Sequence, residues 1–169
     1  AEIGAIQLNG VTFNVADGAG LRTATGIDPA STVTFNVTGS GVGYAYRRAD
    51  GSPGSEDLSF GAGYLAQVTG AGGIGLQALT TGNVTTAATA NVTNAAGGAA
   101  LVAGTAKATT NSGTLTSLST VAPVVDLSNG SGTSFSNGGA ITAVSPAAIA
   151  VRGSAGNDSV VMTAGSIRG

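Results

Sequence analysis

Two short segments combine acidic side chains with glycine and serine, a composition typical of loops that hold a cation. They span residues 51–58 and 153–161, and their acidic and amide side chains are Glu56, Asp57, Asn157 and Asp158. Carboxylate, amide and backbone carbonyl oxygens are the ligands that Ca²⁺ takes in proteins. We therefore treat these four residues as candidate calcium ligands. The competing interpretation is two acidic turns that happen to be rich in Gly and Ser.

The later loop, Gly-Ser-Ala-Gly-Asn-Asp-Ser-Val-Val, resembles the calcium-binding nonapeptide GGxGxDxUx of RTX proteins, with Ser154 replacing the second glycine. The earlier loop is similar, with Glu56 at the position of the acid. In that family, carboxylates and carbonyls from stacked repeats coordinate Ca²⁺ between turns. An isolated copy has no second repeat on which to stack. The stacked arrangement of that family is therefore not expected here, and the calcium prediction is limited to a single ion at either loop, beside the alternative of plain acidic turns.

Other catalytic and metal chemistry finds little support in the chain. Cysteine and histidine are both absent, which excludes disulfides and metal sites built on thiolate or imidazole. Residues 70–75 match GxGxxG, but the helix and the later acid that nucleotide binding needs are missing. Glu56 and Asp57 are adjacent on an expected strand edge and would point to opposite faces, unlike the facing carboxyls of a glycosidase. We predict that the protein is not an enzyme.

The middle of the chain is almost free of charge. Between Ser59 and Val125 the only charged side chain is Lys107, and the whole chain has a net charge of −2 with 8% charged residues. Such a surface is either covered by other molecules or hydrated through Thr, Ser, Asn and Gln alone. We interpret it as a sign of assembly between copies of the chain. Nucleic acid is not expected as a partner, because a basic footprint is missing.

Alternating apolar and polar residues are the main pattern, and helix formers other than Ala are scarce, so we predict a single all-β domain over residues 1–169. Short strands between regular turns favour a β-sandwich or jelly roll, with residues 124–128, 133–136 and 140–144 forming a meander. A β-solenoid is the alternative, because residues 70–120 are punctuated by Gly and Asn. No fixed repeat period is visible there, which weighs against the solenoid.

The N-terminus changes phase around Asn9-Gly10. The apolar residues before it and the apolar residues after it alternate in opposite registers. A two-residue Asn-Gly turn would return both sets to one face, so we predict a β-hairpin over residues 5–15. The other interpretations are a bulge in one long strand, or a free N-terminal strand, residues 1–8, lent to a neighbouring molecule. The side chains of such a donor strand would be Ile3, Ile6 and Leu8.

Ten asparagines include five N-x-[ST] sequons, of which Asn36, Asn83 and Asn91 are our candidate glycosylation sites. Asn36 is expected on the solvent side of its strand. Attached sugars would shield an uncharged surface. The competing interpretation is that these triplets only reflect strands rich in Thr.

These observations favour a structural subunit of an extracellular assembly, such as a pilus-like surface filament, matrix fibre or surface layer. Copies would polymerise through β faces of low charge and through strand addition at exposed edges. One alternative is an adhesin or polysaccharide-binding module that uses Tyr44, Tyr46 and Arg47, and a second is a viral capsid, decoration or fibre subunit. The start at Ala1-Glu2 fits removal of a signal peptide. No apolar run approaches the ~20 residues needed to span a bilayer.

Overall fold

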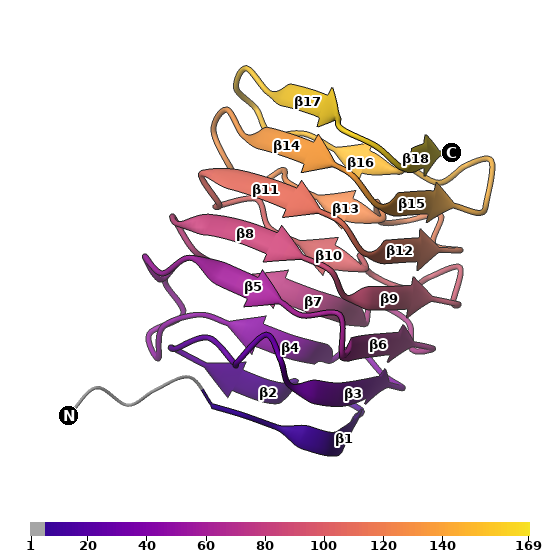
Figure 1. Cartoon of the computed structure of the whole chain (residues 1–169). Coiled ribbons are helices and arrows are strands. Elements are labelled where there is room, and N and C mark those ends of the chain that lie inside the picture. The colour runs from indigo at the N-terminus through magenta and orange to yellow at the C-terminus, as the bar shows by residue number, and fades with distance from the viewer. Residues whose placement is uncertain (1–5) are drawn as a thin grey trace.

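The computed structural model describes residues 6–169 as a stack of parallel β-coils with about 6 turns. Each full coil contributes one strand to each of three parallel sheets, and the chain then climbs by one strand (Figure 1). The seven-stranded sheet contains β1 (Asn9–Val15), β3 (Thr32–Val37), β6 (Tyr64–Val68), β9 (Thr89–Val92), β12 (Thr114–Ser117), β15 (Ala140–Ala143) and β18 (Ser166–Arg168).

The other two sheets complete the coil. The six-stranded sheet contains β2 (Ala19–Thr23), β4 (Val42–Tyr46), β7 (Ile74–Ala78), β10 (Leu101–Val102), β13 (Val125–Asp126) and β16 (Val151–Arg152). The five-stranded sheet contains β5 (Leu58–Phe60), β8 (Asn83–Thr86), β11 (Ala108–Asn111), β14 (Ser134–Asn137) and β17 (Ser159–Met162). The first coil has no strand in the five-stranded sheet, which therefore begins at β5.

The all-β prediction is confirmed, and the architecture is the β-solenoid that we held as the alternative. Strands lie where the later part of the sequence predicts them, but β13, β14 and β15 belong to three different sheets and do not form a meander. A sandwich or jelly roll pairs its strands antiparallel, whereas all the strand pairs in residues 6–169 are parallel. The turns at Asn129-Gly130 and Asn137-Gly138 therefore mark corners of a coil.

The repeat that is not visible in the sequence is present in the register of the strands. Leu65 pairs with Thr89, Thr89 with Thr114, and Thr114 with Ala140, at steps of 24, 25 and 26 residues. The step length varies, and inward positions change residue type, as where Ala90 pairs with Leu115. The period is thus carried only by the alternation of inward and outward positions. An insertion in the second coil obscures it further.

The interior is built from columns of apolar side chains that repeat from coil to coil. Val15, Val37, Val68 and Val92 form one such column and are all buried. The aromatic side chains stack at the N-terminal end, where the rings of Phe13 and Phe35 lie 5.4 Å apart and nearly parallel. Burial of each Val contributes roughly 1.5–3 kcal/mol, whereas the Ala-rich later coils gain less. The core is therefore bulkiest in its first third.

The predicted N-terminal hairpin is wrong. β1 pairs in parallel with β3, and the register shifts between Asn9 and Val11. Gly10 adopts a φ of 66°, which a residue without Cβ accepts readily. The structure thus contains the bulge that was the second interpretation, and the extra residue resets the phase of the alternation. Leu8, before the bulge, and Phe13, after it, both pack against the same core.

Residues 58–68 bend around a corner between two sheets. Apolar residues alternate throughout this segment, but it is divided into β5 and β6, because residues 61–63 leave the strand conformation. At Gly61 an added Cβ would collide with the carbonyl of Pro29, and at Gly63 with the carbonyl of Ser31. Another backbone thus approaches these two glycines so closely that a larger residue would not fit.

The core also contains a buried hydroxyl that has no partner. Thr109 is 1% exposed, and its Oγ1 makes no hydrogen bond. We expect Thr109→Val to raise the free energy of unfolding by about 1–2 kcal/mol, because it removes an unpaired polar atom at nearly constant shape. Urea denaturation followed by circular dichroism measures the change.

Thr86 provides the matched control one strand below, in β8. It is equally buried, but its hydroxyl accepts a hydrogen bond of 3.2 Å from the backbone N–H of Ala88. Thr86→Val should therefore lower the free energy of unfolding. If both variants were destabilised to the same extent, the conclusion that the Thr109 hydroxyl makes no hydrogen bond would be refuted.

Candidate functional site

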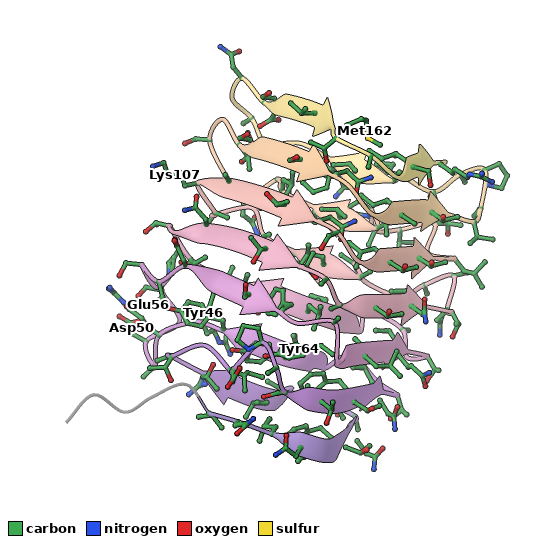
Figure 2. The ribbon with its side chains drawn as sticks, viewed as in Figure 1. Tyr46, Asp50, Glu56, Tyr64, Lys107 and Met162 are labelled. Carbon is green, nitrogen blue, oxygen red and sulfur yellow. The ribbon has the colours of Figure 1, made fainter. Side chains whose placement is uncertain are left out.

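Eight of the charged side chains lie at one corner of the solenoid, where the chain passes from the six-stranded to the five-stranded sheet. Figure 2 shows Asp50, Glu56 and Lys107 along this edge. We call it the charged corner, and it comprises Arg47, Arg48, Asp50, Glu56, Asp57, Lys107, Arg152 and Asp158. Both candidate calcium loops lie on it.

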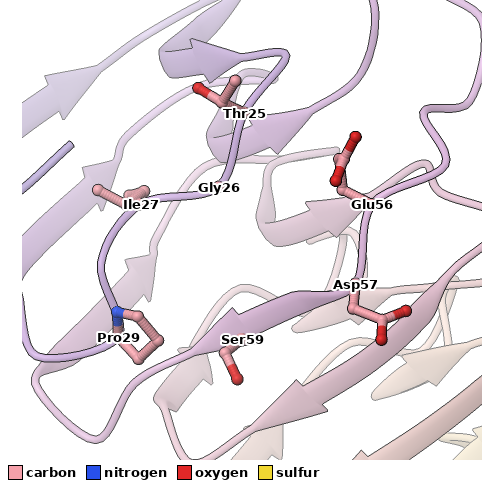
Figure 3. A pocket seen from close by; sticks show the side chains of 7 residues that line it. All are labelled: Thr25, Gly26, Ile27, Pro29, Glu56, Asp57 and Ser59. Atoms are coloured by element: carbon pink, nitrogen blue, oxygen red, sulfur yellow. The ribbon is translucent and has the colours of Figure 1, made fainter. Parts of the chain in front are cut away.

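The first loop precedes β5 and faces a pocket of about 350 Å³. The carboxylate of Asp57 accepts hydrogen bonds from the backbone N–H and the side-chain amide of Asn83, at 2.7 and 3.2 Å. The backbone hydrogen bond, with help from the amide, lowers the pKa of Asp57. The side chains of Glu56 and Asp57 point in different directions (Figure 3), as adjacent residues of an extended chain do.

The second loop precedes β17 and closes on itself. The carboxylate of Asp158 accepts hydrogen bonds from the Ser154 hydroxyl at 2.6 Å, from the Ser154 N–H at 2.6 Å and from the Thr133 N–H at 2.8 Å. The hydroxyl bond is the main reason why the pKa of Asp158 lies below its usual value. Both carboxylate oxygens of Asp158 thus already accept hydrogen bonds from the protein.

The structure does not bring the two loops together. β5 and β17 are the two edge strands of the five-stranded sheet, with three strands between them. Four strand spacings amount to about 19 Å. Across residues 6–169, no three acidic side chains converge in a way that would hold a metal ion. Calcium binding by Asp57, Glu56, Asn157 or Asp158 stays a prediction.

Three aspartates, Asp50, Asp57 and Asp158, accept hydrogen bonds that lower their pKa values, and they predict the acid sensitivity of the fold. Their folded-state pKa values are depressed, so their stabilisation is present above the unfolded value of about 3.9 and is lost as the pH falls through the folded values. Because the chain has no His or Cys, we expect a flat melting temperature between about pH 5 and 8 and a fall below about pH 4. Asp158→Asn should flatten this acid limb in thermal melts, and an unchanged limb would contradict the assignment.

The two tyrosines that the alternative polysaccharide-binding module would use are not at the surface, which argues against that use of them. Tyr44 and Tyr46 are each 1% exposed. The Tyr44 hydroxyl pairs with the Thr23 hydroxyl at 2.8 Å, and the Tyr64 hydroxyl donates to the carbonyl of Asp28 at 2.9 Å. Burial raises the pKa of Tyr64. These rings are part of the core, because inward positions of β4 and β6 face the inside of the coil.

The three candidate glycosylation sites lie on outward positions of their strands. Asn36 is partly exposed, as predicted, and its amide donates to the Asn14 side chain at 3.0 Å. Asn83 is exposed beside Asp57, and Asn91 is partly exposed on the seven-stranded sheet. Sugar attachment at these residues stays a prediction.

The outer face of the seven-stranded sheet contains a feature that sequence reasoning missed. A groove of about 450 Å³ crosses several coils near the carboxyl ends of the strands. Its walls include Gln67, Asn91, Thr116, Thr93, Leu118 and Val144. Each wall is formed by equivalent positions of successive coils. The signal in the sequence is the outward residue that recurs every 24 to 26 positions, which becomes visible only once the register is known.

The two ends of the described solenoid differ in what they expose. At the C-terminal end, Val160, Val161 and Met162 of β17 are 55%, 49% and 47% exposed. Val160 continues the inward column of Phe135, whereas Val161 continues the outward column of Ser136. Figure 2 shows Met162 on this last coil.

The predicted donor segment lies at the other end. Ile6 forms an isolated parallel bridge with Ile27 and is 41% exposed, and Leu8 packs partly against the core. Ile3 lies outside the described residues. The segment that contains Ile6 is therefore already bonded to its own chain through Ile27.

Comparison of the chain with protein-family models, with curated proteins and with solved structures finds no match. In residues 6–169 no helix has the length and apolar character to cross a membrane.

Proposed function

We propose that this chain is a structural element of an extracellular assembly, in which the coils of one copy stack on the coils of the next to build a filament or layer. The observation that carries the proposal is β17, an edge strand of the five-stranded sheet, where Val160 and Met162 occupy inward positions and yet are about half exposed. In the inner coils the equivalent positions hold Phe135 and Asn137, which are fully buried.

Parallel strands favour this kind of growth. An edge strand such as β17 presents a row of backbone N–H and C=O groups that no neighbouring strand uses, and such a row adds another strand without special side chains. The exposed Ile6 at the opposite end provides apolar surface for the partner. Strand addition at β17 would bury Val160 and Met162 and continue the inward columns.

The low charge of the sheet faces also supports the stacking of copies. Stacked coils place equivalent side chains about 4.8 Å apart, and two like charges at that distance repel by about 1 kcal/mol even in water. Repeated acidic or basic residues on a face would therefore oppose stacking both within the chain and between copies. Thr, Ser, Asn and Gln hydrate the faces without this cost.

Paired substitutions on β17 test the proposal. Val160→Lys places a charge at the inward position of the last coil, where it can reach water in the single chain but not beneath another coil. Val161→Lys places the same charge at the outward neighbour, which is exposed to a similar extent. Analytical ultracentrifugation over a range of concentrations and electron microscopy measure the assembly.

We expect the unmodified chain and Val161→Lys to form elongated oligomers that grow with concentration, and Val160→Lys to remain a folded monomer. Circular dichroism checks that the β-sheet content is retained. A chain that stays monomeric at high concentration would overturn the stacking proposal, as would equal assembly by both variants.

A further inference from the structure

The groove on the seven-stranded sheet has two chemically different walls. One wall is a column of amide and hydroxyl side chains, in which Gln67 pairs with Asn91 and Asn91 with Thr116. The other wall continues one position beyond the strands and includes Thr93, Leu118 and Val144. Leu118 is 38% exposed and Val144 is 51% exposed, so the second wall presents aliphatic surface to the groove.

The charge of the groove restricts what it can hold. None of its lining residues is ionisable. A polyanion or a basic peptide would lose hydration on entering without gaining an opposite charge. Nucleic acid, whose affinity depends on contacts between phosphates and cations, is a poor fit for the same reason. The groove therefore selects a neutral ligand.

The lining matches the surface of a sugar chain. Carboxamides both donate and accept hydrogen bonds, as the hydroxyls of a neutral sugar do. The aliphatic wall suits the C–H faces of a pyranose ring. Polar and apolar groups converge here as they do in ordinary small-molecule sites, although this groove is open and shallow.

The direction of the groove favours a polymer. The polar wall repeats with the strand spacing of about 4.8 Å, which is close to the length of one hexose unit in an extended chain. Because the strands are held in a sheet, the amides are positioned before the ligand arrives, which reduces the entropy lost on binding. A straight oligosaccharide can contact one amide or hydroxyl on each coil.

From these observations we propose that the groove walled by Gln67, Asn91 and Thr116 on one side and by Leu118 and Val144 on the other binds an extended, neutral polysaccharide chain. The site goes beyond the structural role and lies on a side face of the solenoid, so it does not depend on end-to-end stacking. Affinity for a short oligosaccharide is expected in the millimolar range, because few groups contact the ligand.

Nuclear magnetic resonance titration of the full ¹⁵N-labelled Val160→Lys chain, which isolates the groove from stacking, tests the site. The probes are cellohexaose and xylohexaose, which are straight and neutral, maltohexaose, which is neutral and curved, and an oligogalacturonate, which carries negative charge. We expect saturable shifts of the Gln67 and Asn91 side-chain amides with the straight neutral probes. The curved and the anionic probes should bind several-fold more weakly.

Substitutions then locate the contact. Asn91→Ala should weaken binding about fivefold to tenfold, the loss expected for one hydrogen-bonding group, and Leu118→Ala should weaken it through the aliphatic wall. The matched control is Asn83→Ala, which removes an exposed asparagine from the five-stranded sheet and should leave the affinity unchanged. The proposal is overturned if no straight neutral probe shifts the groove amides, if Asn83→Ala weakens binding as much as Asn91→Ala, or if the oligogalacturonate binds equally well.

Discussion

Deletion of residues 89–113 should leave a folded solenoid that is shorter by one coil. Thr89 pairs with Thr114, 25 positions later, so the cut removes one complete circuit and joins Ala88 to Thr114. In the intact chain Gly113 precedes Thr114 at the same corner, so the new junction joins chemically similar small residues. The strands above and below the cut keep their phase.

Deletion of residues 89–100 is the matched control, because it removes only about half a coil. In this variant β10 would follow β8 directly. Later strands would therefore lie in the wrong sheet, and their inward residues would point outward. We expect this variant to be largely unfolded. Far-UV circular dichroism and urea denaturation distinguish the two, and the full-coil deletion should show a smaller m-value in proportion to the surface that it no longer buries.

This expectation rests on the one-dimensional nature of the fold. Each coil contacts mainly its two neighbours, so stability is approximately a sum of coil and interface contributions. The new interface places Leu115 over Ala66 in the inward column, where Ala90 lies in the intact chain, and this change will cost some stability. Equal unfolding by both deletions would show that the coils are not interchangeable units.

Replacement of Asn137 by alanine should be among the most destabilising single substitutions in the chain. Asn137 is fully buried at the corner after β14. Its amide donates to the carbonyls of Gly139 and Ser166 at 3.0 and 3.2 Å, and its Oδ1 accepts from the Asn111 amide at 2.7 Å. Alanine removes these three hydrogen bonds and leaves the buried Asn111 amide with only a long bond of 3.4 Å to the carbonyl of Gly113, so we expect a loss of about 2–3 kcal/mol in the free energy of unfolding.

Ser136→Ala is the control, because Ser136 is the adjacent residue and lies on an outward position of the same strand. It should change the free energy of unfolding by less than about 0.5 kcal/mol. A double-mutant cycle with Asn111→Ala measures how far the two amides depend on each other. If Asn137→Ala lowered the free energy of unfolding no more than Ser136→Ala does, the stabilising role of the Asn137 hydrogen bonds would be contradicted.

The sequence predicts local structure well and connectivity poorly. Val33, Phe35 and Val37 alternate with polar residues and lie on one buried face, because a side chain that points inward is apolar whatever the pairing of the strands. The alternation is the same whether the next strand pairs in parallel or antiparallel, so it does not reveal how the strands are connected. The Asn-Gly pair at residues 9–10 illustrates the problem, since the same dipeptide serves a hairpin turn or a bulge.

The candidate sites follow the same rule. The acidic loops could be found from composition, because their glycines and acidic residues are close together in the sequence. The groove could not, because Gln67, Asn91 and Thr116 become neighbours only when steps of 24 and 25 residues are stacked in register. Tyr44 and Tyr46 show the opposite error, since an aromatic cluster looks the same in sequence whether it lines a core or a binding face.

The corner between the five-stranded and seven-stranded sheets has a consequence for how such a chain can diverge. Gly113, Gly139 and Gly165 stack there so closely that an added Cβ would meet a backbone carbonyl of the coil beneath. Outward positions on the faces accept one small polar residue for another, whereas a side chain added at any of these three glycines would push neighbouring coils apart. Distant relatives would therefore be recognised by the spacing of these glycines long after the residues on the faces had drifted beyond alignment.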